Sequence, residues 1–81
     1  MLLENHRQDI DGAEKHYRTA IEINPKHAKA HSNLGMLLEQ HRQDLDGAKE
    51  CYLKALRIDP KHAEARNNLG LLLKFIQEAA D

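Results

Sequence analysis

The feature that most constrains this chain is an internal repeat, because residues 41–75 form a second copy of residues 6–40. Pro25 and Pro60 fix the offset at 35 residues, and about 20 of the 35 aligned positions are identical without a gap. A period of roughly 20–50 residues is typical of folds in which small supersecondary units stack on one another. The sequence therefore predicts a stacked-repeat architecture.

Length, charge and cysteine content narrow the class of protein. The 81 residues allow one small domain, and the net charge of −1 gives no electrostatic attraction to nucleic acid or to an anionic membrane. A single cysteine, Cys51, forms no internal disulfide, which favours a reducing compartment. Because no apolar run is long enough to span a bilayer and no signal segment opens the chain, we expect a cytoplasmic protein without membrane or nucleic-acid partners.

Apolar residues recur at helical spacing in both copies, and valine and threonine are scarce, which argues against strands. The stripe in the first copy is Ala13, Tyr17, Ala20, Ile21 and Ile23, and the second copy repeats it as Ala48, Tyr52, Ala55, Leu56 and Ile58. The pattern predicts four main helices, at 11–23, 26–40, 46–58 and 61–79. Residues 1–5 match residues 36–40, so the chain begins inside a repeat with a helical stub.

Two identical His-Arg-Gln-Asp segments, residues 6–9 and 41–44, are expected to be connectors. Asp9 and Asp44 are candidate N-caps, because a carboxylate can accept hydrogen bonds from the first turn of a helix. Neither connector contains the glycine that commonly lets a helix end in a left-handed residue, so the turn is weakly specified.

The Asn24-Pro25 and Asp59-Pro60 pairs predict an N-cap residue followed by proline at the first helical position. Gly35 and Gly70 lie in mid-helix, where glycine costs about 1 kcal/mol relative to alanine. A repeat that keeps this glycine indicates a close helix–helix crossing at both positions. Tyr17 and Tyr52 are expected in the core, where burial of each ring contributes on the order of 2–3 kcal/mol.

With these residues the chain resembles the tetratricopeptide repeat (TPR) family. The matching positions are Leu34-Gly35 and Leu38, then Ala48, Tyr52, Ala55 and Pro60, with copies at Ala13, Tyr17, Ala20, Pro25, Leu69-Gly70 and Leu73. The resemblance implies an all-α, short right-handed solenoid of antiparallel helix–turn–helix units: a partial unit 1–25, a full unit 26–60 and a half-unit 61–81. The family's opening aromatic is His31 or Arg66 here, and the period exceeds the family's usual 34 residues by one.

The family resemblance also implies a protein-interaction module rather than an enzyme, with no cofactor and a peptide held against the first helix of each unit. The groove positions carried over are Lys29, Ser32, Asn33, Met36, Glu39, Gln40, Glu64, Asn67, Asn68, Leu71, Lys74 and Phe75. Asn33 and Asn68 are the sharpest candidates, because an amide donates to and accepts from a peptide backbone. The alternative is that both are merely polar residues on a solvated face. The family's clamp on a C-terminal carboxylate is rejected, because Glu64 and Asn68 replace its basic residues.

Other chemistry is weakly indicated. His27 and His31 are four residues apart on one helix, yet no third ligand lies at a zinc-motif spacing, so no metal is expected. Cys51 replaces His16 in a helix interior and is interpreted as a packing residue. No nucleophile–base set, phosphate loop or carboxylate pair is present in the sequence.

The last predicted helix carries apolar residues on more than one side, which predicts self-association through Leu72, Leu73, Phe75 and Ile76. Two routes stay open. In one, the last helix of one chain pairs with the first of another, giving a head-to-tail fibre or a closed dimer. In the other, residues 41–44 straighten and the chains exchange helices. A self-associating scaffold without a peptide ligand is therefore the alternative function.

Overall fold

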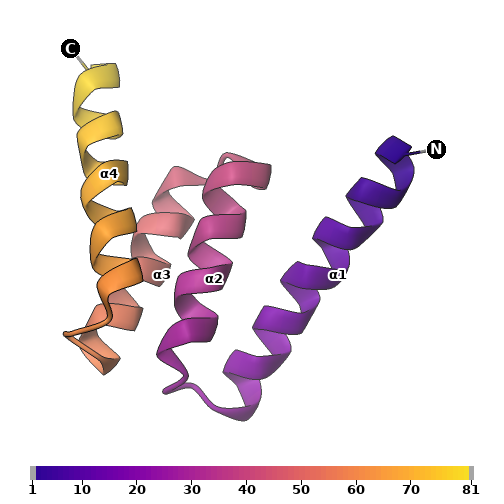
Figure 1. Ribbon diagram of the computed structural model, residues 1–81, viewed down its shortest axis with the longest axis horizontal. Helices are drawn as coiled ribbons and strands as arrows, with labels where there is room; N and C mark the ends of the chain where they lie inside the picture. The colour runs from indigo at the N-terminus through magenta and orange to yellow at the C-terminus, as the bar shows by residue number, and fades with distance from the viewer. Residues whose placement is uncertain (1, 81) are drawn as a thin grey trace.

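A computed structural model describes the backbone of residues 2–80 and the side chains of residues 9–79. The chain forms helices α1 (Leu2–Ile23), α2 (Ala28–Leu37), α3 (Leu45–Ile58) and α4 (Ala63–Ala80), with a π-helical turn, η1 (Leu38–Arg42), extending α2 (Figure 1). No strand occurs within residues 2–80, so the predicted all-α repeat fold is confirmed.

The four helices lie in chain order. α2 contacts α1 on one side and α3 on the other, and α4 packs on α3 with a smaller contact to α2. The N-terminal half of α1 diverges from α2 (Figure 1). The core therefore sits between α2, α3 and α4, and its buried residues are Leu34, Leu38, Ala48, Cys51, Tyr52 and Leu72.

The predicted close crossing exists at Gly35. A Cβ atom at this position would lie 2.8 Å from Cε1 of Tyr52 and 3.1 Å from Cβ of Cys51, so only glycine lets α2 approach α3 this closely. Tyr52 is fully buried, and its hydroxyl donates a 2.9 Å hydrogen bond to Oε1 of Glu39. The same prediction is wrong for Gly70, where nothing lies within 4 Å, because no helix of the described chain packs on that side of α4.

The loop between α1 and α2 corrects the predicted cap. Oδ1 of Asn24 accepts from the backbone N–H of Lys26 at 3.1 Å, so Asn24-Pro25 forms a tight turn rather than a helix start. The N-cap is His27, whose Nδ1 accepts from the N–H of Ala30 at 3.2 Å. The second copy repeats both bonds, from Lys61 N–H to Asp59 and from Ala65 N–H to His62.

The two His-Arg-Gln-Asp segments adopt different structures. In residues 41–44 the chain turns, with Gln43 in the left-handed region (φ 54°), and the predicted cap Asp44 accepts from the N–H of Gly47 at 2.9 Å. Residues 6–9 instead continue α1 as helix, so the predicted connector and the Asp9 cap are wrong. The same four residues therefore adopt two backbone conformations, so their identity alone does not determine the turn.

Candidate functional site

The positions predicted to line a peptide groove lie on α2 and α4, which contact each other. On α2 the side chain of Lys29 is exposed and those of Asn33 and Met36 are half-buried, and the side chain of Gln40, in η1, is exposed. Ser32 is fully buried and cannot reach a ligand, so it is removed from the predicted set.

The α4 positions divide in the same way. Glu64, Asn67 and Leu71 are exposed, whereas Asn68 is half-buried. Nδ2 of Asn68 is shielded from solvent and has no hydrogen-bond partner among the described residues. The predicted pair of amides is therefore unequal, because the nitrogen of Asn68 is shielded without a partner and no amide atom of Asn33 is.

A hollow next to these positions was not predicted. It has a volume of about 440 Å³ and is lined by Glu39, Gln40, Gln43, Leu45 and Phe75. The Phe75 side chain is 55% exposed at this hollow, opposite the start of α3. Sequence reasoning missed Gln43 and Leu45 because the course of the 41–44 segment was not specified by its residues.

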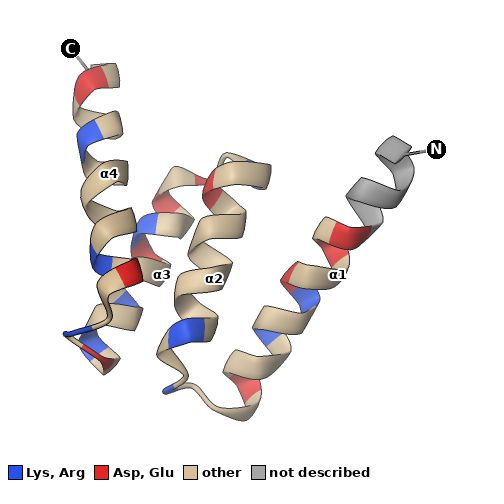
Figure 2. Ribbon diagram, in the orientation of Figure 1, with Lys and Arg blue, Asp and Glu red and all other residues tan. Residues whose placement is uncertain are grey.

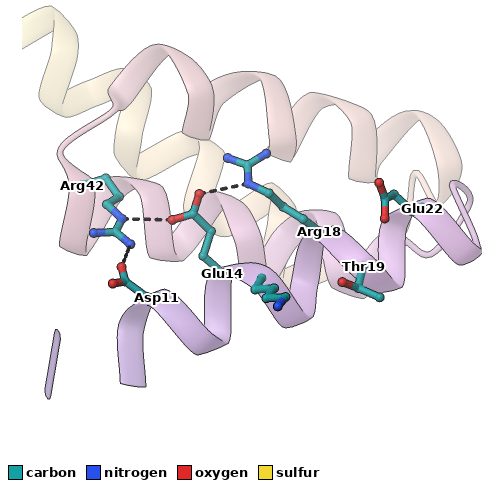
Figure 3. A pocket seen from close by; sticks show the side chains of 7 residues that line it. Asp11, Glu14, Arg18, Thr19, Glu22 and Arg42 are labelled. Carbon is teal, nitrogen blue, oxygen red and sulfur yellow. Dashed lines mark hydrogen bonds and ion pairs between the residues drawn. The ribbon is translucent and has the colours of Figure 1, made fainter. Parts of the chain in front are cut away.

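An ion network ties the turn to α1 (Figure 3). The Arg42 guanidinium donates to a carboxylate oxygen of Asp11, and its Nε donates to Oε1 of Glu14 at 3.0 Å. Arg18 donates to the other oxygen of Glu14 at 2.9 Å. These hydrogen bonds, first from Arg18 and then from Arg42, lower the pKa of Glu14, and the bonds to Asp11 and Glu14 raise the pKa of Arg42.

This network fixes the turn that contains Arg42 against α1, and its opposite charges already pair with one another. The partners lie 28 and 31 residues apart in the chain, so no local pattern could have revealed them. Acidic and basic positions are interspersed along α1, α3 and α4 (Figure 2).

The histidine and cysteine side chains are engaged in packing and capping. Besides the His27 cap, Nε2–H of buried His31 donates to the carbonyl of Pro25 at 2.9 Å. Burial raises the pKa of the Cys51 thiol, which keeps it in its unreactive protonated form. Within the described residues, no cluster of three or more metal-ligating side chains occurs, and no helix is long and apolar enough to cross a bilayer.

Comparison with protein families identifies this helical repeat. The family model described as TPR repeat matches residues 3–41 and again residues 41–74. The chain belongs to the tetratricopeptide repeat family. A search of curated proteins gives no match to it. TPR repeats mediate protein–protein interactions and are generally not catalytic, so the partners of this TPR chain are proteins.

Proposed function

We propose that this TPR chain binds an extended peptide segment of another protein against α2 and α4. The observation that carries the proposal is the amide of Asn33, which is half-exposed on α2 and receives no hydrogen bond from the described residues. An amide at the floor of a groove can donate to and accept from one peptide unit, which gives affinity without demanding a particular side chain.

The second contact is an apolar anchor. Gln40 follows Asn33 by about two turns, in the π-helical turn η1 that extends α2, a distance of about 10 Å along the axis. The hollow between Leu45 and Phe75 lies beside Gln40 and accepts an aliphatic or aromatic side chain. Since an extended peptide advances about 3.3 Å per residue, the anchor side chain sits roughly three residues from the unit held by Asn33.

Charge at the other end of the groove restricts the ligand. Lys29 on α2 and Glu64 on α4 are both exposed, so the two charges offset each other. With an acidic Glu64 where the family's clamp has a cation, an internal peptide segment is favoured over a free C-terminal carboxylate.

The test is a screen of extended ten-residue peptides, followed by fluorescence anisotropy on the strongest binders. Asn33→Ala is expected to raise Kd about tenfold, because a net hydrogen bond or two of about 1 kcal/mol is lost. Phe75→Ala is expected to weaken peptides with a large apolar side chain more than those without one. Lys54→Ala, an exposed change on α3, is the control and should leave Kd unchanged. Peptides that bind Asn33→Ala and the parent chain equally would overturn the proposal.

A second candidate, self-association without a peptide ligand, is favoured by exposed apolar side chains on α4. Leu71 is 60% exposed, Leu73 42% and Phe75 55%. Two of the four residues predicted for this role do not fit it. Leu72 is fully buried in the core of its own chain, and Ile76 is half-buried and already packs against that core. Association would therefore use Leu73 and Phe75.

A further inference from the structure

We propose that α4 of one chain packs on α1 of a second copy, in the arrangement that α2 and α3 adopt within each chain. The proposal rests on the self-association candidate and names its two surfaces. The surface on α4 is the sequence copy of the α2 side of the α2–α3 contact, one repeat later. The surface on α1 is the copy of the α3 side, one repeat earlier. That contact is therefore an internal template for the contact between chains.

The α4 side of the template is only partly covered, with Leu69 packed against the core of its own chain. Its residues Leu69, Gly70 and Leu73 are the copies of Leu34, Gly35 and Leu38. In α2 and the start of η1 all three are buried, with Leu34 at 4% and Leu38 at 6% exposure. In α4 Leu69 is half-buried, Leu73 is 42% exposed, and Gly70 has no atom within 4 Å of its Cβ position. Each α4 residue is thus more exposed than its copy.

The α1 side shows the same difference. The α3 residues in the template are fully or almost fully buried, with exposures of 0% for Ala48, Tyr52 and Ala55 and 9% for Cys51. Their copies on α1 are more exposed in every case: Ala13, Tyr17 and Ala20 are half-buried, and His16 is exposed. Tyr17 also packs against the core of its own chain, so the corresponding surface on α1 is accessible in part.

The lengths of the two helices fit an antiparallel pair between chains. In the template the chain reverses at residues 41–44, whereas α1 and α4 both run straight past the equivalent point, α1 from Leu2 and α4 to Ala80. In the register that places Gly70 opposite His16, as Gly35 lies opposite Cys51, the part of α4 beyond Leu73 continues alongside α1. The straight segments therefore extend the contact instead of clashing with a turn.

One polar substitution distinguishes the contact between chains from the α2–α3 template. Glu39, which accepts from the Tyr52 hydroxyl in the template, is replaced by Lys74 in α4. At the equivalent position between chains the Lys74 ammonium donates to the hydroxyl of Tyr17. The groove position Leu71 lies two residues from both Leu69 and Leu73 and so on roughly the opposite side of α4, where a peptide can bind beside a second copy.

The interface is heterologous, because α4 of one chain meets α1 of the next, and copies add head to tail. Sedimentation velocity over a range of concentrations is expected to show species that grow with concentration. Gly70→Leu adds a side chain in open space within one chain but overlaps the Tyr17 ring of the partner, so it weakens association about ten- to a hundredfold. Ala13→Arg blocks the opposite surface. Mixed together, these two variants are expected to form a one-to-one dimer and nothing larger.

A matched pair of variants distinguishes this contact from nonspecific hydrophobic association. Leu73→Glu is expected to abolish association, whereas Leu71→Glu, an equal change at a more exposed leucine, retains it. Circular dichroism confirms that each variant is helical. If the parent chain is monomeric at all concentrations, both the self-association function and this interface are refuted. If association survives Gly70→Leu and Leu73→Glu, as that of a domain-swapped dimer would, the proposed interface is refuted but the self-association function is not.

Discussion

Gly35 and Gly70 occupy the same position in successive repeats, and their replacement by alanine is expected to change stability in opposite directions. At both positions alanine favours the helix by about 1 kcal/mol. At Gly70 nothing opposes this gain in a monomer, since no atom lies within 4 Å of the new methyl group. Gly70→Ala is therefore expected to stabilise the monomer by about 1 kcal/mol.

At Gly35 the same methyl group would lie 2.8 Å from the Tyr52 ring and 3.1 Å from Cβ of Cys51. Neither neighbour can give way easily, because Tyr52 is fully buried with its hydroxyl bonded to Glu39, and a Cβ atom moves only with its backbone. Overpacking of this kind costs about 1–3 kcal/mol. The propensity gain is common to both variants, so their difference in unfolding free energy measures the overlap alone.

Urea unfolding followed by far-UV circular dichroism gives this difference, at concentrations where sedimentation finds monomer. With a slope of about 1 kcal/mol per molar urea for a chain of this size, the two midpoints are expected to differ by about 1–3 M. A difference below about 0.5 kcal/mol would refute the reasoning, because the close crossing of α2 and α3 would then not require glycine.

Three further changes test the turn, the ion network and the core. Gln43→Gly is expected to raise the unfolding free energy by about 1 kcal/mol, because glycine adopts the left-handed conformation at little cost; equal midpoints in urea would contradict this. The lowered pKa of Glu14 stabilises the fold at pH values above 4.5, the ordinary pKa of this carboxyl group, and the contribution is lost as the pH falls. Arg42→Ala should therefore flatten the acid limb of a curve of stability against pH. Burial, and then the bond to its carboxylate partner, raises the pKa of Tyr52 above its ordinary value of 10, so stability should fall as the pH rises beyond 10. Tyr52→Phe should remove that alkaline dependence and Tyr17→Phe should not, as measured by thermal unfolding between pH 8 and about 11.

The parts of the fold that the sequence predicts are those set by local pattern. The helices, the Asp44 cap and the Gly35 crossing follow from periodicity, capping chemistry and a conserved spacing between copies. The helix starts were misplaced because a histidine ring, rather than the preceding Asn24, supplies the acceptor that caps α2.

The remaining features depend on packing between distant residues. Gly70 repeats Gly35 in sequence but not in surroundings, since contact with a second helix is what makes the glycine necessary. The His-Arg-Gln-Asp segment is helix in one copy and turn in the other, so its four residues do not determine its structure. The exposure of each groove position likewise depends on its neighbours, which explains why Ser32 is buried while Asn33 is half-exposed.

Arg42 belongs to the turn between α2 and α3, but its partners belong to α1. The turn therefore cannot straighten without separating charges that are partly open to water. Dissolved salt screens such pairs over about 8–10 Å at ordinary concentrations, whereas it leaves the burial of Tyr52 untouched. Ionic strength thus becomes a control on how readily this hairpin opens, separate from the forces that hold its helices together.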